Sequence, residues 1–60
     1  GLGRPARPQE SEGLYWKGKA LDALGRKDEA KATWIEGVNG ADKSEKQKEY
    51  IKLCKEALGQ

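Results

Sequence analysis

The segment that decides the fold is LYWKGKALDALGRKDEAKATWIEGV, residues 14–38. Its first half carries residues at spacings of four and three, which share one helix face: Leu14, Gly18, Leu21 and Leu24. This spacing predicts a helix over residues 12–24, with Ser11 as its N-terminal cap. Gly25 is predicted to end that helix in the left-handed conformation, which glycine adopts without strain.

The second half of the segment predicts another helix, over residues 28–38, with Asp28 as the residue that caps it. Its core face is expected to carry Ala30, Trp34 and Val38, which recur at four-residue spacing. Gly18 and Ala30 are the small residues that let the two helices approach, and the indole of Trp34 fills the space between them. Asn39 and Gly40 are expected to end the helix, because both residues tolerate positive φ.

A third helix is predicted over residues 45–58, where Ser44 and Gln47 have the spacing of a capping box. Its apolar stripe comprises Tyr50, Ile51, Leu53, Cys54, Ala57 and Leu58. Gly59 is the expected stop. The fold class predicted is all-α: an antiparallel helical hairpin over residues 11–42, followed by a third packing helix within residues 43–60.

Residues 1–10 contain both prolines of the chain and show no hydrophobic periodicity. They are predicted to be a disordered tail or a cloning remnant. Proline favours the extended polyproline II backbone, so the alternative for residues 4–8 is a proline-arginine ligand for an aromatic groove.

Composition limits the function classes further. Sixty residues form at most one small domain, and a net charge of +2 is too small to indicate nucleic-acid binding. No apolar run approaches the ~20 residues of a membrane span, and no signal peptide is expected. Cys54 is the single cysteine and there is no histidine, which excludes an internal disulfide and a Cys/His zinc site. We therefore expect an intracellular, cytoplasmic protein with no cofactor and no enzymatic activity, in which Cys54 is a small core residue.

The spacing of small and large residues in this segment resembles a single tetratricopeptide repeat (TPR). The matching positions are Leu14, Gly18, Leu21, Gly25, the Glu29-Ala30 pair, Trp34 and Gly37, whereas Asp42 stands where the family has its closing proline. The resemblance implies a helical hairpin that performs no chemistry and acts as a scaffold for protein binding. It also implies that residues 44–58 form the helix that closes such an array.

By the same resemblance, the first helix lines the concave surface that receives a partner's peptide. The residues implied are Glu12, Tyr15, Trp16, Lys19, Asp22 and Ala23. The alternative for Tyr15 and Trp16 is a place in the core or a cover for the third helix. A heat-shock chaperone tail is one partner implied, with Lys19 in a carboxylate clamp, although Trp16 and Glu12 stand where a clamp arginine and lysine are expected.

Two further alternatives stay open. A lone repeat lacks the neighbours that such hairpins normally pack against, so the chain is alternatively a structural element that docks within a larger array, or one that self-associates. The third helix is basic through Lys46, Lys48, Lys52 and Lys55, which leaves calmodulin-like proteins, anionic membranes or nucleic acid as lower-ranked partners.

Overall fold

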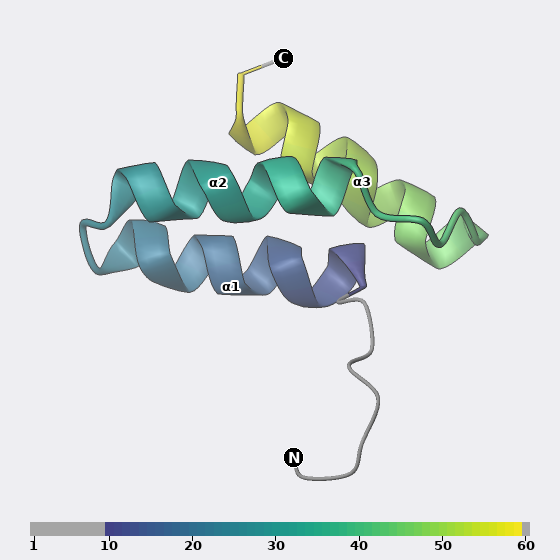
Figure 1. Cartoon of the computed structure of the whole chain (residues 1–60), viewed down its shortest axis with the longest axis horizontal. Helices are drawn as coiled ribbons and strands as arrows, with labels where there is room; N and C mark the ends of the chain where they lie inside the picture. The colour runs from purple at the N-terminus through teal and green to yellow at the C-terminus, as the bar shows by residue number, and fades with distance from the viewer. Residues whose placement is uncertain (1–9, 60) are drawn as a thin grey trace, which may run out of the picture.

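Three helices make up the structure, a computed structural model that describes residues 10–59. They are α1 (Ser11–Ala23), α2 (Lys27–Val38) and α3 (Glu45–Ala57), and the described residues contain no strand. Helices α1 and α2 run antiparallel as a hairpin, and α3 crosses them at the end where α1 begins (Figure 1). Each helix contacts the other two. The predicted all-α fold, a hairpin with a third packing helix, is confirmed; of the segment 1–10, all but Glu10 lies outside the described residues.

The hairpin is held by a close contact between Gly18 of α1 and Trp34 of α2. A Cβ atom on Gly18 would lie 2.7 Å from Trp34 Cε2 and closer still to Nε1 and Cδ1, so only glycine fits. The indole is 6% exposed, and its Nε1–H donates a hydrogen bond to the carbonyl oxygen of Tyr15 at 3.2 Å. The predicted pairing of a small residue with a buried tryptophan is confirmed. Ala30, fully buried, belongs to the same core cluster as Trp34 and Cys54.

The remaining residues predicted to pack the helices also lie in or beside the core. Leu14 is 3% exposed, whereas Leu21 and Val38 are half-buried and pack against the core cluster. Leu24, expected on the same face, is 72% exposed. It lies past the end of α1 as the C-cap residue, and there the helical spacing no longer directs its side chain toward α2.

All three helices meet at Gly37. A Cβ atom there would lie 2.7 Å from Cys54 Sγ of α3 and 3.4 Å from Leu14 Cβ of α1. The carbonyl oxygen of Gly37 accepts a buried hydrogen bond of 2.6 Å from the Ser11 hydroxyl. This point of contact therefore orders the start of α1, the end of α2 and the C-terminal part of α3 together.

Both predicted glycine stops are confirmed, since Gly25 and Gly59 each have φ of +82°. After α1, the amide of Gly25 donates to Asp22 O at 3.0 Å and the amide of Arg26 donates to Leu21 O at 2.9 Å. This pair of bonds is a Schellman motif, and it satisfies carbonyls that the helix end leaves without partners. The turn that follows brings α2 back along α1.

The predicted caps of α1 and α2 are wrong. Ser11 is the first residue inside α1, and its hydroxyl binds Gly37 of α2 instead of an amide of its own helix. Helix α2 begins at Lys27, one residue before the predicted cap Asp28, and has no side-chain cap bond. It ends at Val38 as predicted, but Asn39 has φ of −88° and Gly40 is not among the positive-φ glycines.

The predicted capping box of α3 is also wrong, because Gln47 serves α1. Its Oε1 accepts the amide N–H of Glu12 at 2.9 Å, and its Nε2 donates to Glu10 Oε2 at 3.2 Å. Ser44 is the N-cap residue of α3 by position, but its side chain makes no cap bond. A first-turn amide of α1, which has no partner in its own helix, is thus satisfied by a buried side chain of α3.

None of the three helices in residues 10–59 has the length and the apolar character needed to span a membrane.

Candidate protein-binding surface

Three aromatic rings gather where α1 contacts α3, and we call them the aromatic cluster: Tyr15, Trp16 and Tyr50. The ring centroids of Tyr15 and Trp16 are 5.0 Å apart at a steep angle of 68°. Tyr50 of α3 lies 5.8 Å from Tyr15 and 6.3 Å from Trp16. These tilted and edge-to-face arrangements are the ones that aromatic pairs favour.

Burial divides the aromatic cluster into a supporting part and an exposed part. Tyr15 packs against the core cluster, and both tyrosines are half-buried. Trp16 remains 55% exposed although its indole contacts both of the other rings. Tyr15 therefore covers the core, as one of the two alternatives predicts, whereas Trp16 presents a large apolar surface held by its neighbours. Tyr50, which the sequence placed only in the apolar stripe of the third helix, completes the cluster.

The charged residues predicted on the same face have partners of their own. Glu12 is half-buried and forms an ion pair of 3.1 Å with Lys46 of α3, which ties the two helices together beside Gln47. A hydrogen bond to the Glu12 carboxylate raises the pKa of Lys46. Asp22 pairs with Lys27 at 3.1 Å across the hairpin turn. Lys19 and Ala23 are exposed, and Lys19 has no ion pair among the described residues.

A shallow hollow adjoins the aromatic cluster at the start of α1, and we call it the acidic hollow. It is lined by Glu10, Glu12, Gly13 and Lys17. A Cβ atom on Gly13 would meet nothing within 4 Å, so the hollow is open above the helix backbone. Gly13 and Glu12 precede Trp16 by three and four residues, and these spacings place the hollow and the indole on neighbouring parts of α1.

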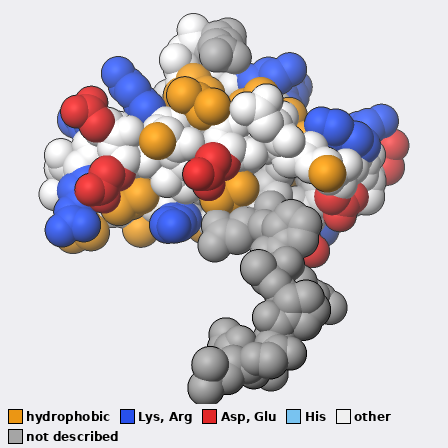
Figure 2. Space-filling model, viewed as in Figure 1, with side chains coloured by type: hydrophobic (Ala, Val, Ile, Leu, Met, Phe, Trp, Pro, Cys, Tyr) orange, Lys and Arg blue, Asp and Glu red, His pale blue; other side chains and the backbone are white. Residues whose placement is uncertain are grey.

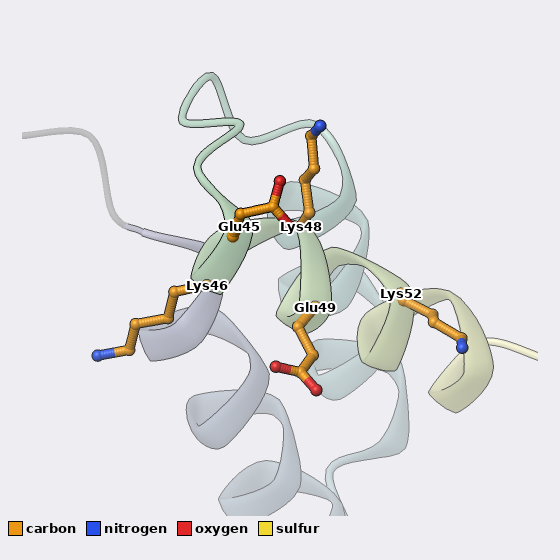
Figure 3. Close-up of a pocket in the computed structure, with 5 residues that line it drawn as sticks. All are labelled: Glu45, Lys46, Lys48, Glu49 and Lys52. Atoms are coloured by element: carbon orange, nitrogen blue, oxygen red, sulfur yellow. The ribbon is translucent and has the colours of Figure 1, made fainter.

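The lysines of α3 do not converge on a common point. A depression on this helix is lined by Glu45, Lys46, Lys48, Glu49 and Lys52. Lys46, Lys48 and Lys52 point in different directions, and two carboxylates lie among them (Figure 3). This side of α3 is therefore a solvated helix face of mixed charge, and its lysines do not form a concentrated site for an anion.

Residues 10–59 hold no group of three or more His, Cys, Asp or Glu side chains that could bind a metal ion. Cys54 is fully buried in the core, and this burial raises the pKa of its thiol. Its predicted role as a small core residue is confirmed.

Among residues 10–59, two large apolar side chains outside the aromatic cluster are exposed: Leu24 at 72% and Ile35 at 49%. On the face drawn in Figure 2, hydrophobic side chains form small patches separated by charged and polar groups. The aromatic cluster differs from such patches because its exposed member contacts two other rings.

Comparison with known proteins adds no relative: no family model matches the chain, and no curated protein and no solved structure gives a significant match.

Proposed function

We propose that this chain is a protein–protein interaction module, a TPR-like helical hairpin closed by a third helix. It binds a peptide segment of a partner protein through the face of α1 that carries Trp16. The observation that carries the proposal is the aromatic cluster, in which Trp16 is 55% exposed and yet packed against Tyr15 and Tyr50.

Such an indole has the properties of a binding anchor. Tryptophan is enriched among the residues that dominate binding energy, because it buries a large area. Ordering a mobile side chain on binding costs about 0.5–1.5 kcal/mol. Contacts with two tyrosine rings hold the Trp16 indole before a partner arrives, so this cost is reduced.

The resemblance to a TPR supports this assignment of the binding face. The hairpin has a glycine opposite the tryptophan of the second helix and a left-handed glycine at the turn. In the family, the corresponding face of the first helix receives the peptide. Lys19 and Trp16 are exposed on it, while Glu12 and Asp22 are held in ion pairs that shape its edges.

The test is a screen of a peptide library with the full chain, followed by a chemical-shift footprint of the selected peptide. We expect the largest shifts at Trp16, Lys19 and Tyr50. Trp16→Ala should abolish binding and leave helicity unchanged by circular dichroism. The matched control is Ile35→Ala, which also truncates a half-exposed apolar side chain and should bind normally. Equal loss in both variants, or a footprint confined to the α3 lysines, would contradict the proposal.

A second candidate is a structural element that docks within a larger helical array. The exposure of Leu24 and Ile35, both outside the aromatic cluster, favours this alternative. If it holds, Ile35→Ala weakens docking to the neighbouring segment and Trp16→Ala does not. A carboxylate clamp for a chaperone tail is less favoured, since Trp16 and Glu12 stand where a clamp arginine and lysine are expected, and the Glu12 carboxylate is paired with Lys46. Either binding role is consistent with the intracellular, reducing location expected from a single thiol.

A further inference from the structure

We propose that the partner segment is an amphipathic α-helix with acidic residues beside its apolar face, and that it packs lengthwise along the outer side of α1. The inference rests on the proposed function, because it names the conformation and the charge of the peptide that the Trp16 face receives. It is carried by a second apolar stripe on α1, which we call the outer stripe: Gly13, Trp16, Ala20, Ala23 and Leu24.

The outer stripe has the spacing of a seam between two packed helices. From Gly13 to Ala23 its members recur at intervals of three, four and three residues, the repeat by which two helices keep one side in contact. Leu24 prolongs the stripe at the C-cap, and at about 100° per residue the whole set covers an arc of roughly 100°. All of its members are exposed, whereas the opposite face of α1 is buried against α2 through Gly18. Helix α1 therefore has two apolar sides, and the described residues cover one of them.

The backbone of α1 favours a helical partner over an extended one. Beyond its first turn, the amide and carbonyl groups of a helix bond to one another and offer nothing to a neighbouring chain. Residues 10–59 contain no strand whose edge an extended peptide could join. An extended peptide laid on the outer stripe would therefore leave part of its own backbone unpaired against an apolar surface. A helix satisfies its backbone internally and presents only side chains.

The shape of the outer stripe suits close approach of that helix. Gly13 has no side chain, a Cβ atom there would meet nothing within 4 Å, and Ala20 carries only a methyl group. Packed helix axes lie about 8–10 Å apart according to the side chains at the contact, so small residues favour the shorter distance. Trp16 and Leu24, both exposed, supply the large apolar area. From Gly13 to Leu24 the rise is about 16 Å, which three turns of a partner helix cover.

The unpaired charges beside the outer stripe are basic. Lys17 and Lys19 border its two edges, both are exposed, and neither forms an ion pair within residues 10–59. The carboxylates next to them are engaged: Glu10 by Gln47, Glu12 by Lys46 and Asp22 by Lys27. A partner helix with Asp or Glu on both sides of its apolar face thus meets a lysine at each edge. Such flanking pairs decide which helices associate and in which orientation.

A second copy of this chain is a poorer occupant of the outer stripe. Pairing two copies through this face brings Lys17 and Lys19 of both into one interface, and the carboxylates beside them already have partners. Like charges facing each other across an interface disfavour the association. The charges therefore select a helix of opposite sign.

The experiment titrates the isotope-labelled full chain with three synthetic peptides of about 15 residues, a length at which isolated helices begin to form. The first carries leucine at alternating three- and four-residue spacing with glutamate on both flanks. The second has lysine in place of each glutamate, and the third has a proline at the centre of the first. We expect the acidic peptide to bind, to gain helicity by circular dichroism and to shift the signals of Ala20, Ala23 and the Trp16 indole. The other two peptides should bind at least about tenfold more weakly.

Two variants of the chain test the stripe and its charges. Ala20→Glu places a charge within the outer stripe and should weaken binding of the acidic peptide at least about tenfold. The matched control is Ala32→Glu, at an exposed alanine of α2, which should bind normally. Lys17→Glu combined with Lys19→Glu should reverse the preference, so that the lysine-flanked peptide binds more tightly. The parent chain's own preference among the three peptides decides the question even if a variant does not fold.

Equal affinity for the acidic and basic peptides, undiminished binding of the proline peptide, or a footprint away from the outer stripe overturns the inference. Shifts in the outer stripe that grow with protein concentration in the absence of peptide overturn it too, because a second copy is then the occupant. Failure of this inference is separable from failure of the proposed function. Library peptides that bind through Trp16 without gaining helicity would refute the helical partner alone. If no library peptide and none of the three synthetic peptides binds, the proposed function fails as well.

Discussion

The Trp34 indole lies against the backbone of Gly18, at a distance that leaves no room for a side chain on α1. This contact explains why a glycine, a poor helix former, is placed in the middle of a helix. Its cost of about 1 kcal/mol in helix propensity is offset by the burial of Trp34 and by the hydrogen bond from the indole to Tyr15.

Gly18→Ala should therefore destabilise the protein although alanine is the better helix former. The new Cβ would lie 2.7 Å from Trp34 Cε2, and displacing the indole should cost about 1–3 kcal/mol. Gly13→Ala is the control in the same helix, where a Cβ meets nothing within 4 Å. That variant should gain about 0.5–1 kcal/mol. Urea denaturation followed by circular dichroism measures both; a Gly18→Ala protein as stable as Gly13→Ala would contradict the contact.

Gln47→Ala should cost about 0.5–2 kcal/mol, the range measured for loss of an N-terminal cap. The reason is that Gln47 accepts the Glu12 amide of α1 and binds the Glu10 carboxylate. Ser44→Ala is the matched control, because the Ser44 side chain makes no cap bond, and its stability should change by less than about 0.5 kcal/mol. The opposite order of effects in thermal melts would restore the capping box expected from sequence.

These results show which features of the fold are local. The helix bounds agree with the predicted ones within a residue at each end, because hydrophobic spacing and the glycine stops are local signals. The contact of Gly18 with Trp34 follows from their sizes. Gln47 could not be assigned in this way, since a glutamine three residues after a serine fits a local capping box equally well. Its partner depends on how α3 crosses α1.

In the candidate binding surface, too, some features follow from the local sequence and others depend on how the helices pack. The exposure of Trp16 follows from its position off the leucine face of α1, about half a turn away from Leu14. Tyr50 joins the aromatic cluster only because α3 is fixed at Gln47 and Cys54, and a helical pattern alone does not give the rotation of one helix against another. The pairing of Glu12 with Lys46 depends on the same crossing.

Asp42 should make stability depend on pH in the acid range. The amide of Ser44 donates to Asp42 Oδ1 at 2.9 Å, and this bond lowers the pKa of Asp42 below its ordinary value of 3.8. A lowered pKa in the folded state means that the carboxylate contributes stability above pH 3.8, and that this contribution is lost as the pH falls through the folded-state pKa. Asp42→Asn keeps an acceptor but does not titrate. The melting-temperature advantage of the parent chain over this variant should therefore shrink below pH 3.8; an advantage constant down to pH ~2 would contradict the bond.

The meeting point of the three helices gives the last prediction. Gly37→Ala should cost about 1–3 kcal/mol, because the new Cβ would lie 2.7 Å from Cys54 Sγ. Cys54→Ala alone removes buried sulfur and should also destabilise the protein. In the double variant, however, the missing Sγ leaves room for the new methyl group, while Leu14 Cβ at 3.4 Å is a tolerable neighbour. The double variant should therefore be less destabilised than the sum of the single ones, by a coupling of about 0.5–3 kcal/mol in a double-mutant cycle. Strict additivity of the three unfolding free energies would mean that α2 and α3 do not meet at these two residues.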